Sequence, residues 1–142
     1  MSTANVNDLF AALKTKWDAT ASLGSATPAF NGPYFQRKPP DTSAGFPYVI
    51  FRHVGTSHEG TTNESAYFLD VVEFTVYNTT PELVGANLGT IRNTFNHEYL
   101  PSLAVGKGSI VKAREAGQRV EEENSNVAKA TLTLEYTRQV AR

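Results

Sequence analysis

The sequence predicts an α+β fold, a two-layer sandwich in which two helices pack against a mainly antiparallel β-sheet. Three observations predict it. Residues 67–78 alternate like a strand, and one face of that strand carries the apolar side chains Phe68, Val72, Phe74 and Val76. This strand leads directly into an amphipathic helix. The order of elements along the chain is helix, weak strand, two strands, helix and two strands, which is typical of an α+β domain.

The length and composition fit a single domain, residues 1–142. A chain of 142 residues can bury about 70% of the surface that it exposes when unfolded. Hydrophobic residues make up 40% of the chain and charged residues 19%, which is enough apolar material for a core. The formal net charge of -1 gives no broad attraction to nucleic acid or to an anionic membrane, so we expect neither a membrane nor a sequence-specific nucleic-acid partner.

The chain contains no cysteine, which excludes disulfides, thiolate metal sites and a cysteine nucleophile. Residues 1–5 lack the basic and apolar regions of a signal peptide, and no apolar run approaches the roughly 18 residues of a membrane span. We therefore expect the protein to act where it is synthesised, or in a particle assembled there.

The first helix is predicted from apolar residues at helical spacing, with Asn5 or Asn7 as its cap and Gly24 beyond its end. Its apolar stripe consists of Val6, Leu9, Phe10, Leu13 and Trp17. Prolines and glycines then interrupt regular structure over residues 25–45. Within this region, residues 29–35 fit a short edge strand and residues 36–45 an exposed loop.

A second strand is predicted over residues 48–54. It is apolar on both faces, which favours a central position in the sheet. Residues 55–65 that follow are polar, and the segment is longer than the usual hairpin turn of about 2 to 5 residues. We interpret it as an exposed loop that serves assembly. Its candidate assembly residues are Thr56, Ser57, His58, Glu59, Thr61, Thr62 and Asn63.

The second helix has a well-specified start. Thr80 can cap the first turn, Pro81 suits the first helical position, and Glu82 lies at the positive end of the helix dipole. We expect the helix to end near His97, where the imidazole can interact with the last carbonyl groups. Its buried stripe is predicted to be Val84, Leu88, Ile91 and Phe95.

Two strands are predicted to close the chain, over residues 109–121 and 127–140, joined by a turn at residues 124–126. In the last strand, apolar and polar side chains alternate, which predicts a sheet with one wet face. Asp70 is the one polar residue on the apolar face of residues 67–78. We expect it to pair with an arginine or lysine, or to lie beyond the edge of the core.

No combination of residues predicts catalysis. His53, His58 and Glu59 are close in sequence, but their placement in a strand and a loop argues against a rigid metal site. Residues 106–109 resemble the end of a phosphate-binding loop, but the upstream glycine is missing and a strand follows. We therefore expect no enzymatic activity, no cofactor and no metal.

The second helix contains two glycines, each of which costs about 1 kcal/mol relative to alanine inside a helix. Gly85 and Gly89 lie with Asn93 away from the buried stripe. Two interpretations are open: a neighbouring subunit approaches this face closely, or the pair is a tolerated surface feature. The three residues are the candidate subunit interface.

Five segments of the chain match a known arrangement of helices and strands: residues 8–13, 46–51, 71–77, 81–82 and 132–136. In these segments the chain resembles the tail terminator (tail-completion, or neck) proteins of long-tailed bacteriophages. The resemblance covers nearly the whole chain and lies in the pattern of elements, not in one motif. It implies a small sandwich that assembles as a hexameric ring on the head-proximal end of the tail tube, ends tail polymerisation and offers a head-joining surface.

The resemblance also implies the partners and the location. The partners are other copies of the chain, the tail tube protein and the head connector protein, and the location is the virion neck, assembled in the host bacterial cytoplasm. No catalytic residue comes with this family. Two alternatives stay open: another head–tail connector or tail-tube component, and a cellular α+β domain that binds a small ligand.

Overall fold

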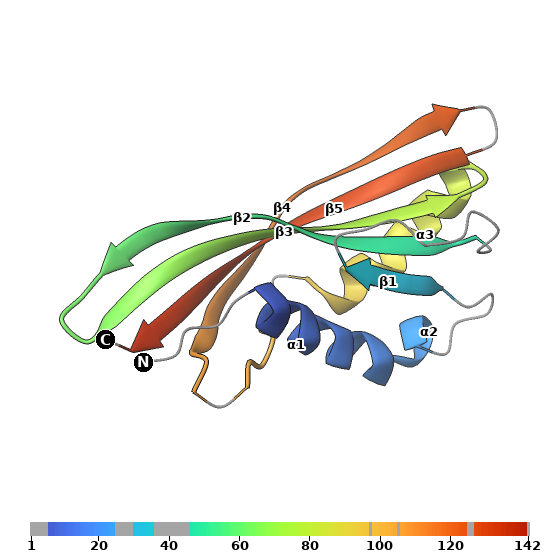
Figure 1. Ribbon diagram of the computed structural model, residues 1–142. Helices are drawn as coiled ribbons and strands as arrows, with labels where there is room; N and C mark the ends of the chain where they lie inside the picture. The colour runs from blue at the N-terminus through green and yellow to red at the C-terminus, as the bar shows by residue number, and fades with distance from the viewer. Residues whose placement is uncertain are drawn as a thin grey trace.

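The computed structural model describes residues 6–24, 30–35, 46–96, 98–104, 106–124 and 127–141. Five strands form one sheet in the order β1-β2-β3-β5-β4. β1 pairs with β2 in parallel, and the other three pairings are antiparallel. The helices lie on one side of this long, strongly twisted sheet (Figure 1). The predicted α+β fold with a mainly antiparallel sheet is therefore confirmed.

Helix α1, Val6–Ala19, follows the predicted apolar spacing. Leu9, Leu13 and Trp17 are buried on one stripe, because residues four apart lie on the same face of a helix. Gly24 does not simply follow this helix: it closes a second, four-residue helix, α2 (Ala21–Gly24). No described helix is long and apolar enough to cross a membrane.

Strand β1, Asn31–Phe35, runs along the edge of the sheet. It pairs with β2 only through residues Tyr48 to Phe51, so the predicted edge strand is confirmed within residues 31–35. The predicted exposed loop at residues 36–45 lies outside the described residues.

Strands β2 (Tyr48–Thr61) and β3 (Ser65–Asn78) form a long antiparallel hairpin. The loop predicted over residues 55–65 is wrong, because the ladder continues from Gly55 opposite Val71 to Thr61 opposite Ala66. Only three residues form the turn, and the Thr62 hydroxyl accepts the Ser65 amide at 3.0 Å. The polar composition of the segment reflects an exposed strand at the edge of the sheet, not a missing strand.

Helix α3, Pro81–Thr94, begins as predicted. The Thr80 hydroxyl accepts the Leu83 amide at 3.2 Å, and Pro81 occupies the first helical turn. The helix ends at Thr94, and the amide of Phe95 still donates to the Ile91 carbonyl. It is therefore slightly shorter than predicted. His97 and its predicted contact lie outside the described residues.

Strands β4 (Ser109–Asn124) and β5 (Val127–Ala141) close the chain as an antiparallel pair. Along β5, buried and half-buried residues alternate as the sequence predicts, except at Thr131, which is buried on the face predicted to be wet. The predicted turn at residues 124–126 falls mostly outside the described residues. β4 is the second edge of the sheet.

The core lies between the sheet and the helices and is rich in aromatic rings. Phe74 of β3 lies at its centre, 5.1 Å from Phe95, 5.3 Å from Phe51 and 5.9 Å from Trp17 between ring centroids. Such offset aromatic contacts add to the free energy of burial. The same core contains Ile91, Leu132 and Leu134, so the predicted facing of strand, helix and closing hairpin is confirmed.

Candidate functional surfaces

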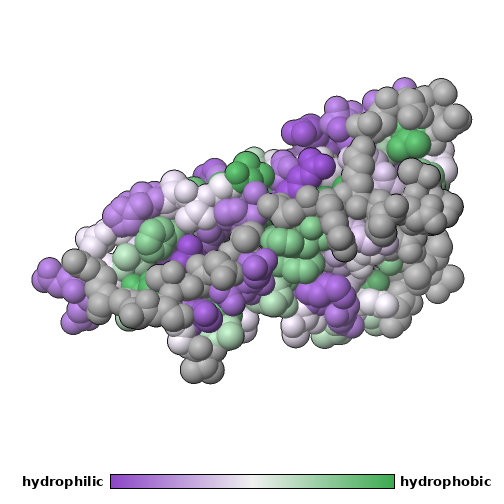
Figure 2. All heavy atoms as spheres, viewed as in Figure 1, coloured by the Kyte–Doolittle hydropathy of each residue, from purple (hydrophilic) through white to green (hydrophobic). Residues whose placement is uncertain are grey.

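The first candidate surface is the part of the β2–β3 hairpin that extends beyond the helices (Figure 1). The structure brings the seven candidate assembly residues together here. Thr56, Ser57, His58, Glu59 and Thr61 lie in β2, and Thr62 and Asn63 lie in the turn; all seven are exposed. This face of the molecule shows hydrophobic residues only as small, separate patches (Figure 2).

His58 stabilises the extended hairpin locally. Its Nε2 lies 2.6 Å from the Thr61 hydroxyl, and its ring lies 5.4 Å from the ring of Phe68 on β3. His53 points to a different partner, Asp70. Among the described residues, no group of three or more histidine, aspartate or glutamate side chains is placed to hold a metal ion.

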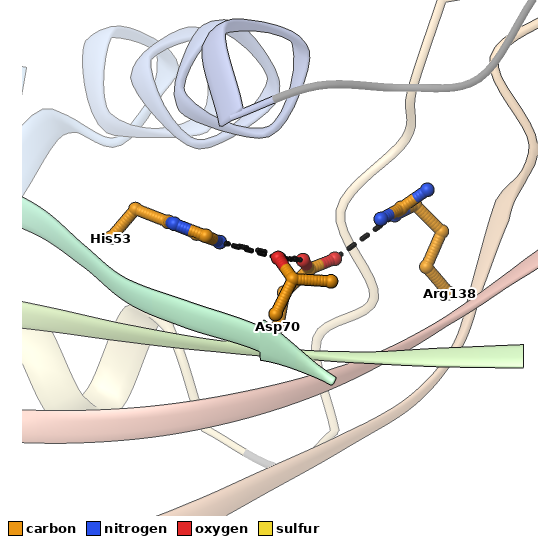
Figure 3. Close-up of polar contacts among 4 residues, drawn as sticks. His53, Asp70 and Arg138 are labelled. Carbon is orange, nitrogen blue, oxygen red and sulfur yellow. Dashed lines mark hydrogen bonds and ion pairs between the residues drawn. The ribbon is translucent and has the colours of Figure 1, made fainter. Parts of the chain in front are cut away.

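A buried polar cluster lies where the hairpin leaves the core. Arg138 of β5 donates from Nε to Asp70 Oδ2 at 3.0 Å, and the Thr56 hydroxyl donates to Asp70 Oδ1 at 2.6 Å. His53 Nε2 lies 3.4 Å from the same Oδ1. His53 and Arg138 reach Asp70 from opposite sides (Figure 3). The cluster therefore joins β2, β3 and β5 at one point, and the predicted pairing of Asp70 with a basic residue is confirmed.

Arg138 is held on two sides. Its side chain is 9% exposed and that of Asp70 is 6% exposed, and the guanidinium carbon lies 4.9 Å from the centre of the Phe68 ring. Burial alone raises the pKa of Asp70. The hydrogen bonds from Arg138 and Thr56 and the charge of Arg138 outweigh it, so the pKa of Asp70 lies below its usual value.

The lowered pKa of Asp70 makes the fold sensitive to acid in a defined range. A carboxylate whose pKa is lower in the folded chain than in the unfolded chain stabilises the fold at pH values above its unfolded pKa of about 4. This stabilisation is lost as the pH falls through the pKa of the folded chain. We expect the free energy of unfolding to fall more steeply below about pH 4 in the parent than in Asp70→Asn. Urea titrations at several pH values measure both slopes, and parallel curves would contradict the assignment.

The second candidate surface is the outer side of α3. Gly85 and Gly89 are half-buried and Asn93 is exposed, and a Cβ atom built on either glycine meets no atom within 4 Å. Nothing in the described part of the chain requires a glycine at these positions by close packing. This surface is separate from the hairpin, so the structure does not bring the two predicted sites together. Its role as a subunit interface stays a prediction.

We expect Gly89→Leu to disrupt subunit assembly without unfolding the chain. A Cβ atom at Gly89 meets no atom within 4 Å, and leucine favours a helix over glycine by up to about 1 kcal/mol, so stability should be unchanged or slightly raised. Light scattering under assembly conditions measures the oligomers. Ala11→Leu, at an exposed position of α1, controls for added apolar surface. An unchanged oligomer distribution in Gly89→Leu would leave the glycines as a tolerated surface feature.

A third surface is a groove of about 610 Å³ on the side of the sheet opposite the helices. Tyr67 and Leu69 of β3 contribute apolar side chains to it, and Glu59 and Lys112 come from the two outer strands. Arg114 also lines the groove and pairs with Glu135 at 3.0 Å. The sequence alone does not predict this groove, because its residues come from four strands.

No protein-family model matches the chain, and no curated protein matches it. Among solved structures, it is similar to a chain of the "Virion of native gene transfer agent (GTA) particle", with a TM-score of 0.75 and 16% sequence identity. The similarity covers 97% of this chain and 99% of that chain. At this identity it shows a shared fold over the full length of both.

Proposed function

We propose that this protein is a structural component of a phage-like virion, and more specifically a tail terminator. In this role it caps the head-proximal end of a tail tube as a hexameric ring, ends tail polymerisation and provides the head-joining surface. The observation that carries the proposal is the fold shared end to end with a chain of a virion particle. The resemblance of the sequence to tail terminators points to the same role.

The surfaces of the chain are suited to assembly. β4 and residues 52–61 of β2 have a described strand on one side only. Most exposed residues on both edges are charged or polar, apart from Val54, Val111 and Val120, and such residues protect free edges from unspecific pairing. A hairpin that extends past the core can reach a neighbouring molecule at little cost to the fold. The proposed partners are further copies of the chain, the tail tube protein and the head connector protein.

The proposed place of action is the neck of the virion, reached by assembly in the host bacterial cytoplasm. The similarity is to a chain of a whole virion and does not by itself distinguish one part of the virion from another. Another head–tail connector or tail-tube component is therefore the second candidate. The effect of the protein on tail length distinguishes this candidate from a tail terminator.

The test uses tail tubes of the matching phage or particle. Purified protein added to growing tubes should appear as a ring at one end of each tube in electron micrographs, and tube length should stop increasing. A phage lacking the gene should make tails of uncontrolled length that fail to join heads. Tails of normal length that lack heads would support a connector instead, and tubes incorporating the protein along their length would support a tube component.

We expect the exposed hairpin residues to matter for this function and not for folding. Because Ser57, Glu59 and Asn63 are exposed, lysine at all three should leave the melting temperature nearly unchanged. The same variant should fail to cap tubes. Shortening the hairpin is a poorer test, because Ser65 and Ala66 pair with β5.

A control variant should carry lysine at the exposed α1 and α2 positions Ala11, Ala19 and Ala21. It should cap tubes as the parent does. If the hairpin variant also caps tubes normally, the hairpin has no role in assembly. A large drop in its melting temperature would show that these side chains support the fold.

A further inference from the structure

The antiparallel part of the sheet has an open strand edge on each side. β1 pairs with β2 only as far as Phe51, so residues 52–61 of β2 pair with β3 alone among the described strands. β4 likewise pairs only with β5. The pairings β2–β3, β3–β5 and β5–β4 are all antiparallel, so β2 and β4 run in opposite directions. Two copies placed side by side in the same orientation therefore bring β4 of one against β2 of the other as an antiparallel pair.

Each open edge contains a bulge, that is, one extra residue relative to its partner strand. In residues 52–58 of β2 the extra residue is Val54, and in residues 115–121 of β4 it is Ala116. A regular strand would lose its alignment with such an edge beyond the bulge, because a slip by one residue reverses the faces of the side chains. Two segments of equal length with one bulge each keep their alignment from end to end.

One antiparallel alignment of the two edges matches both their faces and their charges. It places Arg52 opposite Glu121 and Glu59 opposite Arg114. Glu59 and Arg114 both line the groove on the side of the sheet away from the helices. Arg52 lies on that side because the residue before it is in the core, and Glu121 lies there because it pairs with a lysine between two core alanines of β5. Opposite charges that face each other across a strand pair stabilise the pair.

The four charged side chains are able to make these contacts. Arg52 and Glu59 are exposed and make no ion pair with any described residue. Arg114 donates from Nε to Glu135, and Glu121 accepts through Oε1 from a neighbouring arginine. These exposed pairs are weak, and they leave the other N–H groups of the guanidinium and the second carboxylate oxygen for a further partner.

Other alignments of the same two edges lose this match. A shift by one residue turns the side chains of one strand to the wrong face. A shift by two residues in one direction places Arg52 opposite Arg119, and like charges directly opposite each other destabilise a strand pair. A shift by two residues in the other direction places Glu59 opposite Gly117, which has no charge. The alignment of Arg52 with Glu121 is therefore favoured over its neighbours.

The exposed hydrophobic residues of the two edges meet in the same alignment. Val54 is 60% exposed and Val120 is 48% exposed, the two highest values among the large hydrophobic side chains of the described residues. Val120 comes opposite His53, and Val54 is the bulge residue next to His53. Pairing the edges thus removes apolar surface from water at a point that the charges do not select.

The alignment also has the stagger that a closed sheet requires. Within one copy, the ladder of paired residues leads from Arg52 through β3 and β5 to Gly117 of β4. The alignment between copies uses Glu121, four residues further along β4. Four residues span about 13 Å along a strand and four strands about 19 Å across the sheet, so the strands would tilt by about 35° from the axis of a ring. Strands in closed sheets tilt by about 35–45°, so this contact can repeat around a ring.

We propose that the open edge of β4 in one copy pairs with residues 52–59 of β2 in the next copy, which continues the sheet from subunit to subunit. Pairing of β2 with β2, or of β4 with β4, would use one edge and leave the other open. The head-to-tail contact uses both edges, and such contacts generate rings when they close. This contact specifies how the subunits of the proposed ring meet, so it rests on the proposed function.

Cysteine cross-linking tests the contact directly, because the chain has no cysteine of its own. Ser57 lies opposite Gly117 in this alignment, with Cβ atoms about 5 Å apart, which a small strand movement brings within the span of a disulfide. Both residues are exposed, and a Cβ atom at Gly117 meets no atom within 4 Å. Under mild oxidation, a mixture of Ser57→Cys and Gly117→Cys chains should give linked dimers of one variant with the other. A chain that carries both substitutions should give a ladder of linked oligomers.

Ser102→Cys, at an exposed serine outside both edges, is the matched control. It replaces Ser57→Cys in the control mixture and should give several-fold fewer linked dimers with Gly117→Cys. Both mixtures are oxidised as concentrated protein and again in the presence of tail tubes. Equal linkage by Ser57→Cys and Ser102→Cys under both conditions would overturn the contact. Preferential linkage of either edge variant to itself would also overturn it, in favour of a two-fold dimer.

Amide hydrogen exchange provides a second readout, because it reports on pairing of the backbone. On assembly, amides within residues 52–58 and 115–121 should exchange several-fold more slowly. Glu59→Lys places a lysine opposite Arg114, so it should weaken assembly and reduce this protection. Glu64→Lys, the same change at an exposed turn residue, should alter neither. Unchanged exchange in both segments on assembly, or equal effects of the two lysine variants, would contradict the proposed pairing.

The outcomes also separate this contact from the proposed function. If the parent caps tail tubes but Ser57→Cys and Gly117→Cys link no more than the control mixture, the contact is wrong and the terminator role stands. If the ladder of linked oligomers forms but the parent never binds tail tubes, the contact stands and the terminator role is wrong.

Discussion

Replacing Ile91 or Leu132 by alanine is expected to lower the free energy of unfolding by about 2–5 kcal/mol. Both side chains are fully buried in the core shared by α3 and the sheet. Alanine removes apolar contacts and leaves a cavity that the neighbouring aromatic rings can fill only in part. Urea unfolding followed by circular dichroism measures the change. Melting temperatures within a degree or two of the parent would show that the core is assigned to the wrong face.

Tyr136→Phe is a matched control within the same core. Tyr136 is fully buried, and its hydroxyl has no hydrogen-bond partner among the described residues. Burial also raises the pKa of Tyr136, which keeps the phenol neutral. Removing this hydroxyl deletes a desolvated polar group and leaves the ring in place. We therefore expect the free energy of unfolding to stay the same or to rise.

Breaking the Asp70–Arg138 pair is expected to lower the free energy of unfolding by about as much as the alanine substitutions at Ile91 and Leu132. Arg138→Met leaves the Asp70 carboxylate buried without its cation and should cost about 3–5 kcal/mol. The double variant Asp70→Leu, Arg138→Met removes both charges, so it should recover most of this loss. Urea unfolding at neutral pH measures the free energy of unfolding of the parent, of Arg138→Met and of the double variant.

The exposed pair Lys14–Asp18 on α1 provides the control for this second prediction. It has a shorter N–O distance, 2.7 Å, but both side chains are well exposed. Lys14→Met should change the free energy of unfolding by no more than about 0.5 kcal/mol. If Arg138→Met has an effect as small as this, the cluster contributes little and the hairpin is held by its backbone ladder alone.

The elements that the sequence predicted well are those whose pattern is local. In β5, the alternation from Ala128 to Tyr136 follows directly from the pleat of a strand facing water on one side. In α3, the capping threonine and the following proline identify the start, because they satisfy the first turn without help from the rest of the chain. These signals depend only on adjacent residues and on contact with solvent, so they can be recognised in the sequence alone.

The hairpin extension shows where local reasoning failed. Residues 55–61 have the polar composition of a loop, but they form a strand because β3 supplies a continuous row of partners. An edge strand with both faces exposed has no buried side to produce an alternating pattern. The extent of β2 therefore could not be read from its own residues.

Of the polar cluster, the sequence predicted the position of Asp70 but not its partner. Asp70 was recognisable as a charge on an apolar face, and Arg138 occupies an inward position of β5 beyond Tyr136. Their meeting depends on the register of β3 against β5, across 68 residues of sequence. The groove was not predicted at all, because it requires four strands to be placed side by side.

The sequence by itself determined the α+β class, the buried stripes of α1 and α3, the helix cap at Thr80 and the inward face of the last strand. The tertiary structure alone decided the order β1-β2-β3-β5-β4, the length of the hairpin, the partner of Asp70 and the groove beside Lys112. The physical reason is the distance along the chain over which each feature is specified. Periodicity and capping arise from neighbours along the chain, whereas strand order and register arise from the packing of the whole core, which one segment's residues do not specify.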